Sequence, residues 1–142
     1  MYSFVFITHG ELGSTLLSIA SRIMDIDVSD RTGFFSIEFS MAAELDKMKT
    51  NLESKINEFL AKGHKVIILV DIFGGSPSNM ALSLAKKENV DVVSGVNLSM
   101  VMYSLEHRDD DYDIRTMVDG IIRSSRQNIT SAKQLLEKRD SK

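Results

Sequence analysis

A histidine and an aspartate each come directly after a short apolar run in the sequence. His9 follows the run 2–8 and precedes Gly10, and Asp71 follows the run 65–70. In an open parallel sheet, the carboxyl ends of neighbouring strands form a crevice where such folds bind ligands. If the two runs are adjacent strands, the Asp71 carboxylate can hydrogen-bond one ring nitrogen of His9 and leave the other free as a nucleophile. The alternative is that His9 only ends a strand, and position alone does not separate the two interpretations.

A glycine-rich turn follows Asp71. Residues 74–77 are Gly-Gly-Ser-Pro, and we expect Ser76 to cap a helix whose first residue is Pro77. The backbone around Gly74 and Gly75 and the Ser76 hydroxyl could then bind a phosphate at the positive end of this helix. The same residues could equally form only a tight turn and an ordinary helix cap. The P-loop lysine and the three glycines of the dinucleotide fingerprint are both missing.

Three further groups of polar residues are weaker candidates. Thr8 precedes His9, and its side chain either faces the crevice or packs inward. Asn97 follows the fourth expected strand and could donate to a phosphoryl oxygen, although closing a turn is the favoured interpretation. The acidic run 109–111 could bind a metal, but three consecutive side chains point apart, so a solvated loop is favoured. We therefore expect no metal site and no cofactor.

Composition narrows the class of protein. The chain has 142 residues, 43% of them hydrophobic and 26% charged, which is typical of a single globular domain. Its net charge of −3 argues against nucleic acid or an anionic membrane as a partner. Because it has no cysteine, disulfides and thiolate metal sites are excluded. No apolar run approaches the roughly 20 residues that span a bilayer, and no signal peptide is evident, so we expect a soluble, cytoplasmic protein.

Strand and helix patterns alternate along the chain. We expect strands at 2–8, 33–37, 65–70 and 90–94, and helices at about 12–24, from Ser40 to Gly63, at 76–87 and at 97–107. From Tyr112 onward the spacing is mostly helical, and 123–136 continues it unless residues 127–130 interrupt the helix. This pattern predicts a single-domain, open, doubly wound α/β fold, with a mainly parallel sheet flanked by helices on both faces. The domain is expected to cover residues 1–136, with a frayed tail at 137–142.

Three segments together resemble one protein family. They are Ile-Thr-His-Gly at 7–10, Asp-Ile-Phe-Gly-Gly-Ser-Pro-Ser-Asn at 71–79, and Gly-Val-Asn-Leu-Ser-Met at 95–100. The chain is similar over about residues 1–125 to the mannose-type (mannose/fructose/sorbose) IIA domain of the bacterial phosphoenolpyruvate-dependent sugar phosphotransferase system, and 71–79 is the most specific part.

The resemblance implies a phosphohistidine relay. His9 would be phosphorylated on the ring nitrogen that faces the crevice, Asp71 would hydrogen-bond the other nitrogen, and Ser76 with the nearby amides would receive the phosphoryl group. The donor would be the phosphocarrier HPr, and the acceptor a histidine of a IIB component. The family typically forms homodimers by exchanging a C-terminal strand, whereas residues 123–136 here favour a helix.

Other aspects of function stay open. No proline- or alanine-rich linker follows the domain, so the IIB component is expected on a separate chain, and the protein should be peripheral to a membrane permease at most. The same site could serve a regulatory module in which phosphorylation of His9 only reports metabolic state. A phosphotransfer subunit of a dihydroxyacetone kinase matches the run 71–79 less well. A hydrolase that uses His9 and Asp71 on water ranks low, because no general acid or metal is evident.

Overall fold

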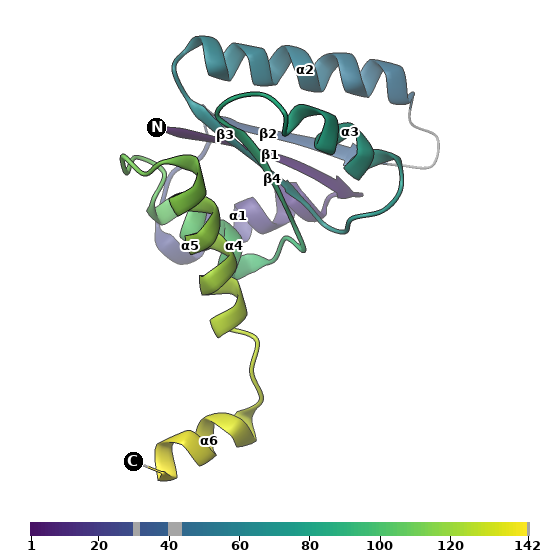
Figure 1. Ribbon diagram of the computed structural model, residues 1–142. Helices are drawn as coiled ribbons and strands as arrows, with labels where there is room; N and C mark the ends of the chain where they lie inside the picture. Colours follow the sequence, from purple (N-terminus) through teal and green to yellow (C-terminus); the bar gives the residue numbers. More distant parts are fainter. Residues whose placement is uncertain (30–31, 40–43, 142) are drawn as a thin grey trace.

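The strands form one parallel sheet. The computed structural model describes residues 1–29, 32–39 and 44–141. Within these ranges the strands are β1 (Tyr2–His9), β2 (Phe34–Phe39), β3 (Lys65–Val70) and β4 (Val90–Ser94). They lie side by side in the order β2-β1-β3-β4, and every neighbouring pair is parallel (Figure 1).

Helices cover both faces of this sheet. The buried side chains of α1 (Leu12–Met24), α4 (Leu98–Glu106) and α5 (Ile114–Gln127) share one core cluster. Those of α2 (Leu45–Ala61) and α3 (Ser76–Leu84) share the other (Figure 1). The expected doubly wound α/β architecture is therefore confirmed.

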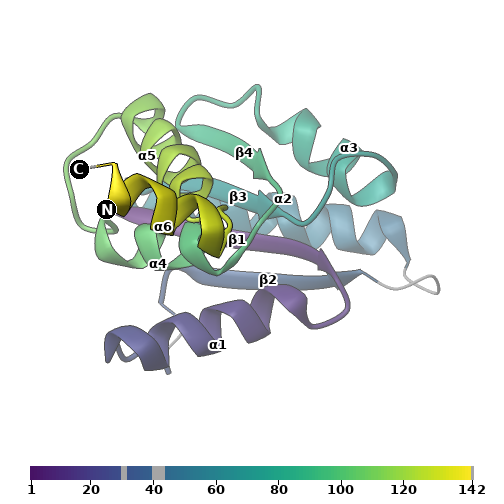
Figure 2. The same cartoon turned by 90° about the horizontal axis from the view of Figure 1, so that it is seen from below.

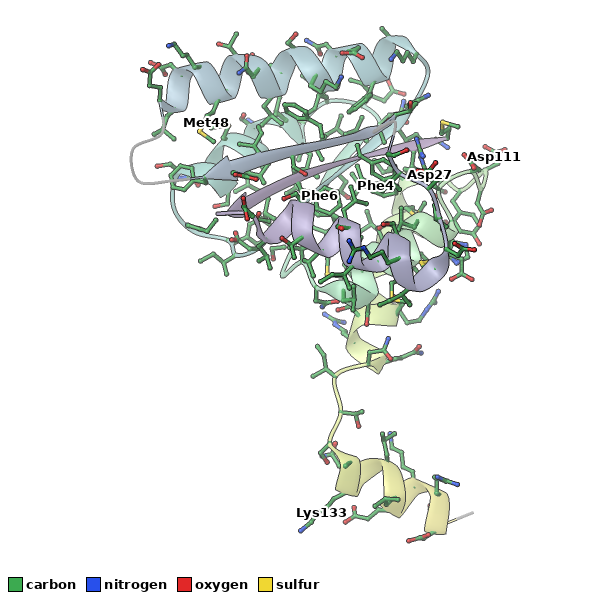
Figure 3. The ribbon with its side chains drawn as sticks, turned by 180° about the vertical axis from the view of Figure 1, so that it is seen from behind. Phe4, Phe6, Asp27, Met48, Asp111 and Lys133 are labelled. Carbon is green, nitrogen blue, oxygen red and sulfur yellow. The ribbon has the colours of Figure 1, made fainter. Side chains whose placement is uncertain are left out.

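The two central strands explain why their sequences are almost continuously apolar. Successive side chains of a strand point to opposite faces, so a strand covered on both faces buries all of them. Phe4 and Phe6 of β1 pack on the side of α1 (Figure 3), whereas Val5 and Ile7 pack on the side of α2. In β3 every residue after Lys65 is buried.

The strand order places a switch point between β1 and β3. The chain leaves β1 for β2 on one side and leaves β3 for β4 on the other. At such a point the loops after the two strands diverge and leave an open crevice at their carboxyl ends. Because Ile7 is paired with Val70, His9 and Asp71 both emerge at this edge of the sheet.

The end of β2 and the start of α2 differ from the sequence-based expectation. β2 continues to Phe39 rather than ending at residue 37. The expected cap Ser40 lies outside the described residues, and α2 begins at Leu45, after Glu44. The helix ends as expected before Gly63, whose φ of 79° lies in the left-handed region that glycine tolerates.

The helix after the glycine-rich turn begins one residue earlier than expected. Gly75, with φ of 85°, occupies the N-cap position, so Ser76 is the first helical residue and not the cap. A positive φ at the cap suits glycine and would strain serine. The helix also ends at Leu84 and not near residue 87, because Lys87 N–H bonds the Leu84 carbonyl in a tighter turn.

The C-terminal part of the chain is helical and interrupted. α5 ends at Gln127, a short connection follows over 128–131, and α6 (Ala132–Asp140) continues past the expected domain end at residue 136. This connection overlaps residues 127–130, where the sequence predicted a possible interruption of the helix. All nine residues of α6 are exposed, and the helix stands away from the body of the molecule (Figure 1). In the view from below, α6 overlaps the body in projection (Figure 2).

Candidate functional site

The side chains of His9 and Asp71 are in contact at the carboxyl edge of the sheet. His9 is the last residue of β1, and Asp71 directly follows β3. The distance between His9 Nδ1 and Asp71 Oδ2 is 2.8 Å, and the backbone N–H of His9 donates to the same oxygen, also at 2.8 Å. The other carboxylate oxygen, Oδ1, accepts from the N–H of Ile72 at 2.9 Å. The imidazole is 55% exposed, whereas the carboxylate is only 13% exposed.

These hydrogen bonds define the charge of Asp71 and the tautomer of His9. Burial by itself would raise the pKa of Asp71, but the hydrogen bonds from the backbone and ring of His9 and from Ile72 N–H outweigh it and hold this pKa below its ordinary value. The carboxylate is therefore ionised at neutral pH and can only accept hydrogen bonds. It follows that Nδ1 of a neutral His9 carries the proton, which leaves the lone pair on Nε2.

Phe39 is part of the site and was missed from the sequence. Its ring meets the imidazole of His9 edge-on, with 5.5 Å between ring centroids and an interplanar angle of 77°. Its carbonyl accepts from the N–H of Gly10 at 3.1 Å. The expected strand ended at residue 37, and the period-two spacing of the apolar residues Phe35, Ile37 and Phe39 is the signal that would have extended it.

The glycine-rich turn leaves two amides open at the start of α3. Gly74 and Gly75 have φ of 108° and 85°, in the region that glycine alone adopts readily. The N–H of Gly74 donates to the Ser78 hydroxyl at 2.9 Å. In the described part of the chain, the N–H groups of Gly75 and Ser76 have no such acceptor, and the Ser76 side chain is exposed. Free amides at a helix N-terminus attract anions.

The structure places Thr8 beneath the site and not on its surface. Its side chain is buried, with 2% exposure, and Oγ1 accepts from the N–H of Gly13 at 2.8 Å. This bond fixes the start of α1, and Gly13 lies so close to Phe6 that a Cβ there would come within 2.6 Å of it. Thr8 thus takes the inward-packing option, and direct contact with a phosphoryl group stays a prediction.

Asn97 uses both ends of its amide within its own part of the fold. Oδ1 accepts from the N–H of Met100 at 3.1 Å and caps α4, while Nδ2 donates to the Ser125 hydroxyl at 2.5 Å. Asn97 follows β4, which β3 separates from β1. Asn97 thus caps a helix within its own part of the fold, and a contact with phosphate stays a prediction.

A second histidine–aspartate pair lies at the opposite end of the sheet. His107 Nδ1 is 2.6 Å from Asp110 Oδ2, and its ring packs between Tyr103 and Tyr112 at centroid distances of 4.2 and 5.6 Å. The hydroxyl of Tyr2, the first residue of β1, donates to the Tyr112 carbonyl. His107 is 23% exposed and its Nε2 lies 3.8 Å from the Glu106 carboxylate, so this imidazole is enclosed where that of His9 is open.

The described residues form neither a metal-binding cluster nor a membrane-spanning helix. No group of three or more His, Cys, Asp or Glu side chains within the described ranges could hold a metal ion. Across the same residues, every helix is too short or too polar to cross a membrane.

The chain is similar in sequence to known components of the PTS system. A family model described as "PTS system fructose IIA component" matches residues 3–122. The chain is 31% identical over 130 residues to the PTS system mannose-specific EIIAB component of Escherichia coli (strain K12), which covers 89% of this chain and 38% of that protein. It is 24% identical over 139 residues to the PTS system fructose-specific EIIA component of Bacillus subtilis (strain 168), covering 97% of this chain and 91% of that protein. The chain thus spans about 38% of the length of the EIIAB relative.

A solved structure has the same fold. The phosphotransferase system component EIIA from Streptococcus agalactiae matches with a TM-score of 0.80 and 23% identity, over 94% of this chain and 99% of that one. This likeness shows a shared fold, in agreement with the architecture described above.

The lowered pKa of Asp71 gives a prediction about pH. Because the folded pKa is below the unfolded value of about 3.9, the carboxylate stabilises the fold above that pH, and this contribution is lost as pH falls through the folded pKa. We expect the NMR titration midpoint of the Asp71 carboxyl carbon to lie below ~3.9, and to rise in His9→Ala. The difference in unfolding free energy between wild type and Asp71→Asn should shrink as pH falls from about 5 to below ~3.9. A midpoint at or above the ordinary value would contradict the hydrogen-bond assignment.

Proposed function

The chain belongs to the family of PTS system fructose IIA components, and we propose that it accepts a phosphoryl group on Nε2 of His9 from HPr and passes it to a histidine of a separate IIB component. As a IIA component of the mannose/fructose family, it is a part of a sugar phosphotransferase system. The observation that carries the proposal is the contact between His9 and Asp71, which reserves Nδ1 for the carboxylate and leaves Nε2 as the nucleophile.

The proposed transfer of the phosphoryl group to His9 is a direct displacement at phosphorus that needs no external base. The Nε2 lone pair of His9 attacks the phosphorus atom, the bond from phosphorus to the donor breaks, and its electron pair returns to the donor. Positive charge develops on the His9 ring, and the ionised Asp71 counters it through the Nδ1–H hydrogen bond. Transfer to the IIB histidine is the same displacement with His9 as the leaving group.

A relay site must bind phosphate only moderately, because tight binding would slow the second transfer. The amides of Gly75 and Ser76 with the Ser76 hydroxyl provide neutral donors at the positive end of α3. The run 71–79 contains no lysine or arginine. We propose that these donors hold the phosphoryl oxygens and that Gly74, whose N–H already has an acceptor, shapes the turn instead.

The rim of the site favours a protein as the donor. Ile72 and Phe73 directly follow Asp71, and their side chains are 61% and 51% exposed. Large apolar side chains exposed side by side at a site are typical of surfaces that contact other proteins. A protein partner that buries these two side chains would bring its phosphoryl group to His9.

We also propose that the chain forms a homodimer through its C-terminal arm, residues 128–141. Isolated helices shorter than about 12–15 residues are marginal in water, and α6 has nine residues, all exposed. Leu135, Leu136 and Ile129 are 51%, 56% and 75% exposed. Packing on a second copy would bury these side chains, with a helix in place of the exchanged strand expected from the resemblance.

Phosphorylation should depend on His9 alone among the three histidines. After incubation with phosphoenolpyruvate, enzyme I and HPr, we expect intact-mass analysis to find one acid-labile phosphoryl group on the wild type and none on His9→Gln. His107→Gln, which alters the other histidine–aspartate pair, should be labelled like the wild type. Labelling of His9→Gln would place the phosphorylation site elsewhere, and no labelling of the wild type by an active HPr would refute the relay.

Removing the charge of Asp71 should slow transfer. Asp71→Asn no longer compensates the charge on the His9 ring and no longer fixes its tautomer, so we expect the phosphorylation rate to fall on the order of a hundredfold. The matched control is Asp110→Asn, which changes the enclosed pair and should transfer at the wild-type rate. Rapid-quench measurements of phosphoryl uptake compare the three proteins, and equal rates for wild type and Asp71→Asn would remove Asp71 from the mechanism.

The C-terminal arm can be tested by its effect on mass in solution. We expect sedimentation equilibrium to give a dimer for the wild type and a monomer for Leu135→Glu/Leu136→Glu, because buried carboxylates without partners oppose association. Lys133→Glu on the same helix should stay dimeric. A monomeric wild type would refute this arrangement and leave the relay itself untouched.

A further inference from the structure

The Ser78 hydroxyl links two residues of the glycine-rich turn. Ser78 is the third residue of α3 and only 1% exposed. Its Oγ accepts from the N–H of Gly74 at 2.9 Å and donates to the carbonyl of Gly75 at 3.1 Å. A serine hydroxyl has a single proton, which this arrangement commits to Gly75.

This link holds a segment that would otherwise be free to move. Gly74 and Gly75 both have positive φ, and glycine enters such conformations and leaves them with little cost. A Cβ placed on Gly74 would meet nothing within 4 Å, so no packed neighbour occupies the space on that side of the residue. The N-cap position of α3 also has no side-chain cap. Ser78 therefore takes the restraining role that a cap usually has, from inside the helix.

The same hydrogen bonds decide which backbone groups can meet a phosphoryl group. The Gly74 N–H is directed to Ser78. The Gly75 carbonyl, an acceptor that would repel phosphate, accepts from both the Ser78 hydroxyl and the N–H of Asn79. What stays available are the N–H groups of Gly75 and Ser76 at the start of the helix. We infer that Ser78 is a positioning residue for phosphoryl transfer: it acts through Gly74 and Gly75 and does not touch the phosphoryl group. This inference rests on the function proposed above.

A purely structural role would have a different signature. Buried serines in helices often donate to a carbonyl three or four residues earlier without any role in a site. The chain contains such a residue in Ser104 of α4, which is 1% exposed and donates to the Met100 carbonyl at 2.8 Å. Ser104→Ala therefore removes an equally buried hydroxyl in α4, outside the glycine-rich turn. It is the matched control.

The first test compares variants of the full chain. Loss of one direct donor to a transition-state oxyanion slows enzymes by about 10²–10³, and an indirect effect should be smaller, so we expect Ser78→Ala to slow phosphorylation about tenfold. Ser104→Ala should keep the wild-type rate. Both substitutions can lower the melting temperature measured by thermal unfolding. Equal rates for Ser78→Ala and wild type would overturn the inference while leaving the phosphorylation of His9 intact. If the wild type is not phosphorylated at all, the proposed function itself fails.

The second test needs no substitution at Ser78. In amide NMR spectra of the wild type before and after phosphorylation, the resonances of Gly75 and Ser76 should move strongly, because their N–H groups gain a charged acceptor. The Gly74 amide should move far less, because its acceptor stays the Ser78 hydroxyl. A Gly74 shift as large as those of Gly75 and Ser76 would overturn the assignment, even if Ser78→Ala did not fold.

Discussion

One carboxylate organises the open edge of this protein. Asp71 accepts hydrogen bonds from the backbone of His9, from its ring and from Ile72 N–H. The first bond joins the ends of the two central strands, the second orients the imidazole, and the third begins the turn toward α3. Because the three donors converge on a group that is only 13% exposed, the position of His9 and the path of the glycine-rich turn are not independent.

The surroundings of this carboxylate explain why two histidine–aspartate pairs in one chain differ in chemistry. The His107 pair has an even shorter contact, 2.6 Å, but two tyrosine rings and the Glu106 carboxylate enclose its imidazole. The His9 ring is held by Asp71 on one nitrogen and by an edge-on contact with Phe39, and it is otherwise 55% exposed. A hydrogen-bonded pair becomes a candidate nucleophile only where the second nitrogen is accessible.

Patterns of apolar residues predicted the sheet well, because strands that are buried on both faces, such as β1 and β3, have almost continuously apolar sequences. The sequence made the meeting of His9 and Asp71 conditional on these two strands being neighbours, and the strand order β2-β1-β3-β4 meets that condition. The predicted N-cap of α3, Ser76, was wrong. The sequence indicates a cap by residue type, whereas the backbone conformation of Gly75 places the cap one residue earlier. Phe39 was missed although the apolar period of β2 reaches it, because the strand was ended two residues early. The contribution of Ser78 could not be predicted, since it depends on a hydroxyl that turns back to the preceding loop.

The switch point between β1 and β3 leaves room at His9 for one partner protein at a time. His9 lies on a single open edge of the sheet, with one accessible ring nitrogen. Under the proposed function, two proteins that exchange a phosphoryl group with it would therefore compete for the same place. The donor would have to leave before the acceptor arrives, and neither could be bound in advance while the other reacts. An acceptor in large excess would then block loading as well as speed unloading. Flux through such a carrier is greatest when the two partners are balanced and each dissociates quickly, which favours weak, short-lived complexes over tight ones.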